Sequence, residues 1–330
     1  MNEQNSNRFE KPEVYAAKHK DDFERMASQS GGMFAVISDV ILSQGGIIYG
    51  CAFDDSFQVI HIRGDNADQR NRMRYSKYVQ SRIGDVYKNV LADLKMGRNV
   101  LFSGTSCQVA GVLSFIKMSS DKLVGKLFTV DIVCHGVPSP LVWRDFLAWE
   151  SNKKKTKIKG VICRNKKKFG WKSSITTIQF DNGKTVDSRV YPKFFYSHVA
   201  LRPSCFKCPY KSILHPSDIT IGDYWGIEKA VPGFKDEKGV SLVLINTSQG
   251  KDLFDFCKDK IDSVQTTVVQ CMQKALIEPY NPPENRVQFW KDYRINSFDD
   301  IAKKYGNYTF MKVIRWKIKY FLKRIGLIKD

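Results

Sequence analysis

The feature that most constrains the fold is an alternation of short apolar strands with helical patterns between residues 98 and 150. The letters "NVLFSG" and "LFTVDIVCHG" predict two buried strands, and each is followed by a helix, "SCQVAGVLSFI" and "SPLVWRDFLAWE" respectively. Each helix returns the chain to the starting end of the next strand, so strands connected in this way pair in parallel. We therefore expect an α/β fold whose sheet is parallel at least in part.

The rest of the chain divides around this unit. Apolar residues recur at helical spacing over 33–41 and 83–97, and "IIYGCAF" and "QVIHIR" predict two strands. Beyond residue 150, "KIKGVICR", "SSITTIQF" and "KTVDSRVY" are typical of antiparallel strands, and "GVSLVLINTSQG" predicts a strand that leads into a helix. We expect two halves that share one active cleft. The predicted parts are a polar N-terminal segment over 1–28, an α/β half over 29–150, a more β-rich half over 151–275 and a C-terminal extension over 276–330.

Composition limits the class of protein. The chain of 330 residues has a net charge of +19, and no zinc-finger, helix-turn-helix or RNA-binding pattern accompanies its lysines, so we expect no nucleic acid partner. The first residues lack the apolar segment of a signal peptide, and no apolar run is long enough to cross a bilayer. We therefore expect a cytoplasmic protein, in which the eight cysteines are not a disulfide framework.

Four cysteines form a possible metal site. Cys107 and Cys134 follow predicted strands, where α/β sheets bind ligands, and Cys107 also lies at a helix start, which stabilises a thiolate. Cys205 and Cys208 are separated by two residues, a spacing that lets two thiolates chelate one metal centre. Four sulfurs suit either zinc or a [4Fe–4S] cluster. The other cysteines lie in apolar patterns and are assigned to the core: Cys51, Cys163, Cys257 and Cys271.

Three weaker motifs accompany the cysteines. "SGGMF" opens a helix whose free amides can bind phosphate, "YSKY" places a lysine between aromatic residues, and "GDYW" follows a predicted strand, where an aromatic pair can stack on a planar ring. Each motif alone is more typical of an ordinary loop, a helix start or packing than of a binding site. His135, next to Cys134, is a candidate proton donor, although single histidines are more often structural. The residues concerned are Ser30, Gly31, Gly32, Ser76, Lys77, Asp223, Trp225 and His135.

The tail "YTFMKVIRWKIKYFLKRIGLIKD" predicts a basic amphipathic helix. Its apolar positions follow helical spacing, and lysines and arginines fill most of the remainder. Two outcomes are open, a helix docked on its own domain or a helix lying on an anionic membrane surface. The apolar stripe consists of Phe310, Val313, Ile314, Ile318, Phe321, Leu322 and Ile325.

Taken in order, these motifs resemble the coenzyme F420 hydrogenase/dehydrogenase beta-subunit family. The resemblance runs from about Pro12 to about Gly250 and rests on "SGGMF", "GGIIYG", "YSKYVQS", "VLFSGTSCQVAG", "VDIVCHGVPSP", "RPSCFKCPY", "SDITIGDYWGI" and "GVSLVLINTSQG". It is similar in particular to the bacterial branch often found among polysaccharide-biosynthesis genes. Family members usually read "GTPC" where this chain has Ser106, and "GSKY" where it has Tyr75.

The resemblance implies an iron–sulfur flavoprotein. Cys107, Cys134, Cys205 and Cys208 would bind a [4Fe–4S] cluster, with FAD at the three weaker motifs. Electrons would pass singly between cluster and flavin, and a hydride would pass between FAD and an organic substrate or deazaflavin coenzyme. Many relatives carry an N-terminal ferredoxin-like domain, but no cysteine precedes Ser30 here. Electrons would then come from a separate protein or directly from a reduced coenzyme, and the basic surface favours a separate ferredoxin-like electron carrier.

Two other functions are compatible with the same residues. One is an electron-transfer subunit with no substrate of its own. The other is a zinc-stapled binding protein without redox activity, which would be colourless, whereas an iron–sulfur flavoprotein purified without oxygen is brown.

Overall fold

The computed structural model describes residues 7–324 and residue 327. Contacts divide the chain into two units, which are described separately below. Unit 1 consists of Met1–Gly136, Lys166–Ser173 and Lys207–Pro279, and unit 2 of Val137–Asn165, Ser174–Phe206 and Tyr280–Asp330.

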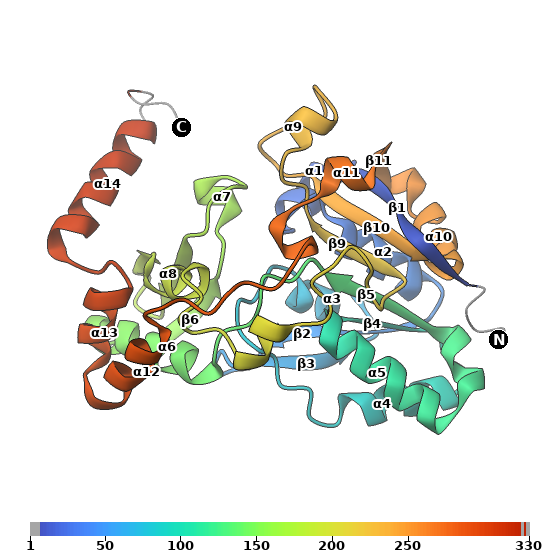
Figure 1. The fold of residues 1–330 in the computed structure, drawn as a ribbon, viewed down its shortest axis with the longest axis horizontal. Helices are drawn as coiled ribbons and strands as arrows, with labels where there is room; N and C mark the ends of the chain where they lie inside the picture. The colour runs from blue at the N-terminus through green and yellow to red at the C-terminus, as the bar shows by residue number, and fades with distance from the viewer. Residues whose placement is uncertain (1–6, 325–326, 328–330) are drawn as a thin grey trace. The chain divides into compact units, whose positions relative to one another are not determined.

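Unit 1 is built on an eight-stranded mixed sheet (Figure 1). β2, β4, β5 and β9 are parallel neighbours, and the remaining pairs are antiparallel. The α/β class and the partly parallel sheet expected from the sequence are thus confirmed. In spatial order, the strands are β11 (Ile261–Thr266), β1 (Arg8–His19), β10 (Ser241–Thr247), β9 (Ile219–Asp223), β5 (Leu127–Ile132), β4 (Val100–Thr105), β2 (Ile47–Phe53) and β3 (Val59–Gly64).

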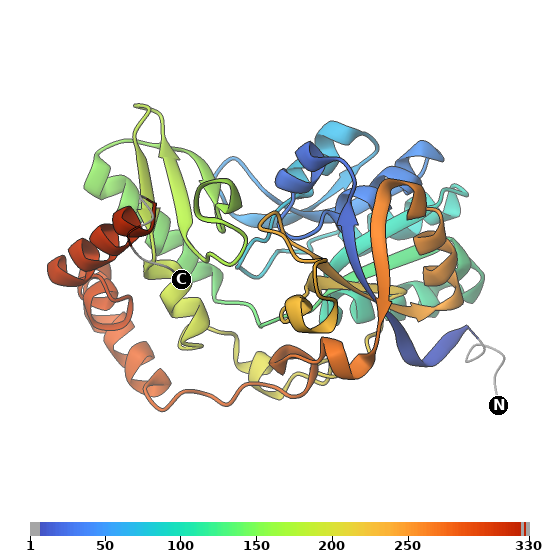
Figure 2. The same ribbon diagram turned by 90° about the horizontal axis from the view of Figure 1, so that it is seen from above.

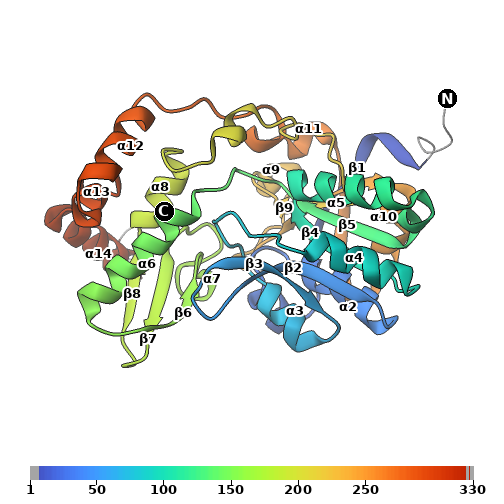
Figure 3. The same ribbon diagram turned by 90° about the horizontal axis from the view of Figure 1, so that it is seen from below.

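Helices cover both faces of this sheet (Figure 3). α2 (Met33–Ser43) and α10 (Ser248–Asp255) pack on one face, where Ile48 and Leu101 point. α4 (Val86–Lys95) and α5 (Ser106–Ser119) pack on the other, against the alternate residues of the same strands. The strands are therefore buried on both faces and read as continuous apolar runs. The shorter helices of unit 1 are α1 (Asp22–Met26), α3 (Ala67–Met73), α7 (Lys166–Phe169), α9 (Ile227–Ala230) and α11 (Val268–Cys271).

The N-terminal segment holds a strand that the sequence analysis missed. β1 pairs with both β10 and β11 and is therefore interior to the sheet; Figure 2 shows it beside β11. Only Val14 to Ala17 form an apolar run, and charged residues and Pro12 flank it, so the pattern is too short to stand out from a polar segment. Long-range pairing, rather than local propensity, makes this segment a strand.

Unit 2 combines a small antiparallel sheet with helices. β6 (Ile158–Ile162), β7 (Thr176–Phe180) and β8 (Thr185–Ser188) form the sheet, with the predicted turn between the last two. An aromatic core joins α6 to α8 and α13 through contacts of Phe146 with Tyr191 and Phe298. The helices are α6 (Pro140–Lys154), α8 (Val190–Tyr196), α12 (Arg286–Ile295), α13 (Phe298–Tyr305) and α14 (Phe310–Arg324).

α14 confirms the predicted C-terminal helix. Ile325 lies outside the described residues, as do the side chains of Lys317, Phe321, Lys323 and Arg324. In the described part of the chain, no helix combines the length and apolar character needed to cross a membrane.

Candidate functional site

Cys107, Cys134 and the "GDYW" motif follow the ends of strands at one edge of the large sheet. The carboxyl ends of parallel β2, β4, β5 and β9 meet at this edge. β1 runs in the same direction as β9, because each is antiparallel to β10, so β1 also ends there. Five strands therefore deliver their following segments to a common edge.

Cys107 follows β4 at the start of α5. Thr105 is the N-cap of α5 and forms a capping box with Gln108, which fixes the first turn. The Thr105 hydroxyl lies 3.1 Å from the Cys107 sulfur, and the thiol is exposed. An exposed thiol at the start of a helix is accessible to a metal ion.

Cys134 occupies the matching position on the next strand. Thr105 of β4 pairs with Ile132 of β5, and each cysteine lies two residues beyond its member of this pair. Cys134 is half-buried. Strand register therefore brings these two cysteine segments to neighbouring positions at the edge.

The C-x-x-C pair lies where the chain passes from unit 2 to unit 1. Cys205 belongs to unit 2, in a 3₁₀ helix over Pro203–Lys207, and its amide donates to the Arg202 carbonyl at 2.9 Å. Cys208 belongs to unit 1. Both thiols are half-buried. In unit 2, burial lowers the pKa of Arg286, and the nearby Cys205 thiol opposes this shift, so a cation lies close to this thiol.

The loop after Cys208 contacts residues that flank the two strand-end cysteines. The Lys211 ammonium donates to the carbonyl of His135, next to Cys134, at 3.1 Å. Nδ1 of His215 lies 2.8 Å from the Asp131 carboxylate and 3.2 Å from the hydroxyl of Ser106, next to Cys107. Three cysteine segments of unit 1 are thus linked by side-chain hydrogen bonds.

These hydrogen bonds connect the cysteine segments, but they do not arrange the thiols around a common centre. Among the described residues, no three His, Cys, Asp or Glu side chains are arranged to hold a metal ion. The donor set nevertheless fits an iron–sulfur cluster chemically, since it offers free thiols that follow neighbouring strands at one edge. By contrast, burial raises the pKa of Cys257 to about 12 and that of Cys271 to about 11, as expected for core cysteines.

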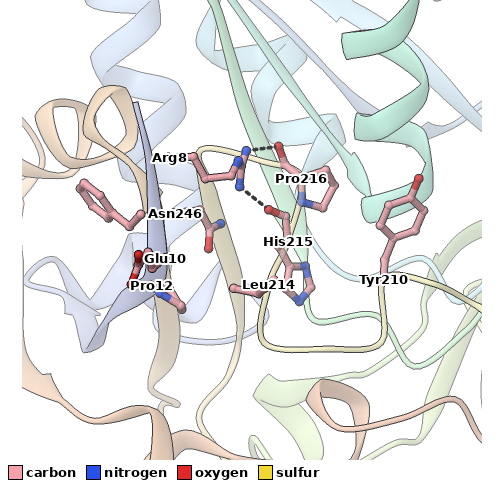
Figure 4. Close-up of a pocket in the computed structure, with 9 residues that line it drawn as sticks. Arg8, Glu10, Pro12, Tyr210, Leu214, His215, Pro216 and Asn246 are labelled. Carbon is pink, nitrogen blue, oxygen red and sulfur yellow. Dashed lines mark hydrogen bonds between the residues drawn. The ribbon is translucent and has the colours of Figure 1, made fainter. Parts of the chain in front are cut away.

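A pocket of about 540 Å³ lies beside the same loop (Figure 4). The Arg8 guanidinium donates to the carbonyls of His215 and Pro216, and so holds the loop against β1. Nε2 of His215 is buried and has no hydrogen-bond partner among the described residues. The pocket is lined by Arg8, Phe9, Glu10, Pro12, Tyr210, Leu214, His215, Pro216 and Asn246.

The Ser30–Gly31–Gly32 turn is held tightly at the end of β1. The Ser30 hydroxyl donates to the Val240 carbonyl at 2.8 Å, and the Gly31 amide donates to the Ser241 hydroxyl at 2.9 Å. Gly32 is the N-cap of α2, and no side chain caps this helix. The amides that begin α2, rather than the polar groups of Ser30 and Gly31, are therefore the groups suited to an anion.

Ser76 and Lys77 lie near the end of β2. Both are half-buried, and the Lys77 ammonium lies 5.7 Å from the ring centre of Phe53, the last residue of β2. The same ammonium donates to the Arg74 carbonyl at 2.6 Å, and the Arg74 side chain forms an ion pair with Glu24 of α1. This ion pair links the "YSKY" motif to the segment that leads into Ser30.

Asp223 and Trp225 are held together at the end of β9. The Asp223 carboxylate accepts a hydrogen bond from the Trp171 indole at 2.6 Å. Trp225 stacks on Trp171 with ring centres 5.1 Å apart and stays 40% exposed. An exposed indole of fixed orientation is suited to contact a planar ring.

The structure adds residues that the sequence analysis did not single out. Lys166 and Trp171 are almost fully buried, although they lie in a lysine-rich stretch of the sequence. Asp131 and His215 form the buried pair described above. The only sequence signal was indirect: Trp171 is an apolar residue inside a highly charged segment, and composition does not distinguish a buried lysine from its exposed neighbours.

Comparisons with known proteins identify the family and the fold. Over residues 97–268, just over half of the chain, the sequence matches the family described as the C terminus of the coenzyme F420 hydrogenase/dehydrogenase beta subunit. The fold is similar to a chain of the F420-reducing [NiFe] hydrogenase complex from Methanosarcina barkeri, with 16% identity, a TM-score of 0.54 and coverage of 92% of this chain and 94% of that chain. No curated protein matches the chain significantly. The chain therefore belongs to the coenzyme F420 hydrogenase/dehydrogenase beta-subunit family.

Proposed function

We propose that this protein is an iron–sulfur flavoprotein oxidoreductase. It transfers electrons between a [4Fe–4S] cluster and FAD, and it transfers a hydride between FAD and an organic substrate or a deazaflavin coenzyme. The family to which it belongs comprises redox proteins and is associated with iron–sulfur and flavin cofactors. The resemblance to a bacterial branch found among polysaccharide-biosynthesis genes supports a sugar-linked substrate.

One observation carries this proposal. Segments bearing thiols and an exposed tryptophan follow the ends of parallel strands at one edge of the sheet. Lys77 lies near the end of β2, and the uncapped start of α2 lies beside the end of β1. A cluster and a flavin need these groups together, because thiolates hold iron while amides and cations compensate phosphate charge. A half-buried lysine and a half-exposed indole at the same edge support the proposal.

Each residue then has a defined role. Cys107, Cys134, Cys205 and Cys208 would hold the cluster, which supplies one-electron chemistry when bound, as the flavin supplies both one-electron and hydride chemistry. The start of α2 and Lys77 would compensate the negative charge of the flavin, and Trp225 would contact its ring. His135, next to Cys134, is the proposed proton donor, and the Lys211 bond to its carbonyl holds its backbone in place.

We propose a separate ferredoxin-like protein as electron carrier. The structurally similar Methanosarcina chain is part of a hydrogenase complex, which supports function with protein partners. It also supports a second candidate function, that of an electron-transfer subunit whose substrate is bound by another subunit. An acceptor screen separates the two, since only a self-sufficient reductase reoxidises its flavin with a substrate in the absence of other proteins.

We further propose that the protein is cytoplasmic and binds the anionic inner surface of the membrane through α14. The support is the composition of the helix, in which lysines and arginines accompany exposed apolar side chains.

The flavin assignment is tested with Lys77→Ala. The protein is purified without oxygen, and the flavin-to-protein ratio is read from its absorbance. We expect the wild-type protein to retain FAD and Lys77→Ala to lose most of it, because a cation facing the cofactor is removed. Lys95→Ala, at an exposed lysine that ends α4, is the matched control and should retain FAD. Equal retention in all three proteins would remove Lys77 from the site.

A further inference from the structure

The segment Lys166–Ser173 belongs to unit 1, although in sequence it lies between β6 and β7 of unit 2. Gly170 adopts a left-handed φ of 79°, which lets the chain turn within this short segment. Lys166 and Trp171 are 3% and 1% exposed, so the segment inserts these two side chains into unit 1, while its other lysines stay exposed. Such burial of a lysine requires a compensating set of partners.

Lys166 finds these partners in backbone carbonyls. Its ammonium donates to the carbonyls of Arg25 at 2.7 Å, Ser30 at 3.1 Å and Lys238 at 2.7 Å. An ammonium group has three donors, and here each meets a carbonyl. Lys166 thereby ties the turn before α2 to the end of α1 and to the loop before β10.

Trp171 contacts the "GDYW" motif of the proposed flavin site. Its indole donates to the Asp223 carboxylate at 2.6 Å, and its ring carries the stacked Trp225. A Cβ atom at Gly239 would lie 3.0 Å from the Trp171 ring and 3.2 Å from the carbonyl carbon of Ser30. Trp171 and the Ser30 turn thus pack against the same glycine, so one segment contacts both motifs.

From these contacts we propose that Lys166 and Trp171 are positioning residues for the flavin site. Lys166 fixes the turn that leads into α2, and Trp171 fixes Asp223 and the exposed face of Trp225. The segment Lys166–Ser173 therefore sets the spacing between the anion-binding and ring-binding parts of the site. This inference rests on the proposed function for the identity of the ligand, but the positioning itself is a property of the chain.

The test compares two tryptophans of the full-length protein. Trp171→Phe keeps an aromatic ring beside Trp225 and removes the hydrogen bond to Asp223. Trp149→Phe is the matched control, because the Trp149 indole is also buried and donates to a carboxylate, that of Asp299 at 3.2 Å, within unit 2. Loss of a hydrogen bond to a charged group should raise the dissociation constant for FAD about tenfold in Trp171→Phe. Trp149→Phe should lower the melting temperature about as much as Trp171→Phe does, and it should leave FAD affinity unchanged.

Equal FAD affinity in Trp171→Phe and the wild-type protein, measured by titrating the flavin-free proteins with FAD, would overturn the proposal. A merely structural role predicts this result, since it changes the melting temperature alone. Absence of FAD binding by the wild-type protein would instead contradict the proposed function.

Hydrogen–deuterium exchange tests the positioning without FAD. In Trp171→Phe, exchange should accelerate over residues 222–226, and in Lys166→Met over residues 28–33, with neither change in Trp149→Phe. Unchanged exchange at these segments would overturn the proposal even if FAD binds.

Discussion

At the scale of the residue, the two glycines of the turn before α2 are required by the backbone and also belong to the proposed flavin site. A Cβ at Gly31 would lie 2.2 Å from the Ala17 carbonyl oxygen and 2.6 Å from the Ser241 amide nitrogen, both of them backbone atoms. Gly32 adopts a left-handed φ of 95°. Substituting either glycine therefore perturbs folding as well as any anion site, which is why Lys77 is the cleaner probe of flavin binding.

Tyr75 stands where family members usually have glycine, and its backbone conformation explains that preference. It adopts φ of 66°, in the left-handed region, at the position where related sequences usually have glycine. The backbone conformation of the "YSKY" motif is thus consistent with glycine at this position, and this chain carries the strain of a larger residue there.

The stability of the protein should depend on pH through His61. Burial lowers the pKa of His61 from 6.5 to about 4, opposed by the hydrogen bond to the Ser103 carbonyl. The unfolded chain therefore binds more protons between these pH values, and the free energy of unfolding falls as the pH drops through this window. In His61→Phe this contribution disappears. When the pH is lowered from 6 to 5, the free energy of unfolding of the variant should therefore fall by about 1 kcal/mol less than that of the wild-type protein. Urea unfolding at the two pH values measures the difference, and identical losses would show that His61 does not titrate in this way.

At the scale of the element, the exposure of α14 bears on whether this helix docks on its own unit or binds an anionic membrane surface. Phe310 and Ile318 are 79% and 53% exposed, so the helix does not bury its apolar positions fully against its own unit. Within the unit, the Arg189 guanidinium lies 5.9 Å from the ring centre of Trp316. The exposed apolar residues and the basic composition favour an anionic surface as partner.

We expect the full chain to sediment with vesicles rich in anionic lipid, and a chain ending at Gly306 to stay in solution. Ile318→Ser should lower the affinity for the vesicles, measured by sedimentation, about tenfold, because one isoleucine that would be buried in the lipid is lost. Ile295→Ser, at an exposed isoleucine that ends α12, should not change it. Equal sedimentation of the full and shortened chains would assign α14 to docking on the protein.

Elements differ in how far the sequence predicts them. The pattern identifies β4, α5, β5 and α6 because helical and strand periods alternate there over a continuous stretch. It misses β1, whose pairing with β10 joins residues more than two hundred positions apart. The strand-end positions of Cys107 and Cys134 are confirmed, since they depend only on local pattern. The bonds of Lys166, Trp171 and His215 were not predictable, because each joins distant segments through a single side chain.

At the scale of the whole molecule, the net charge of +19 indicates how a partner would be recognised. An acidic ferredoxin would be attracted over distances set by the Debye length, which falls from about 30 Å at 0.01 M salt to about 10 Å at 0.1 M. We therefore expect the rate of reduction by such a ferredoxin to fall about tenfold over this range. Reduction by a small uncharged reductant should change little, and a ferredoxin rate independent of salt would contradict electrostatic recognition.

The most direct test of the account is the iron content of the anaerobically purified protein. The wild-type protein should be brown and contain about four iron atoms and as much sulfide. Replacement of Cys107, Cys134, Cys205 or Cys208 by alanine should remove most of the iron, because in this account each would supply one of four thiolate ligands. Cys257→Ala, at a buried thiol whose pKa is raised to about 12, should keep full iron. Full iron in Cys205→Ala, or a colourless wild-type protein that contains zinc, would contradict the account.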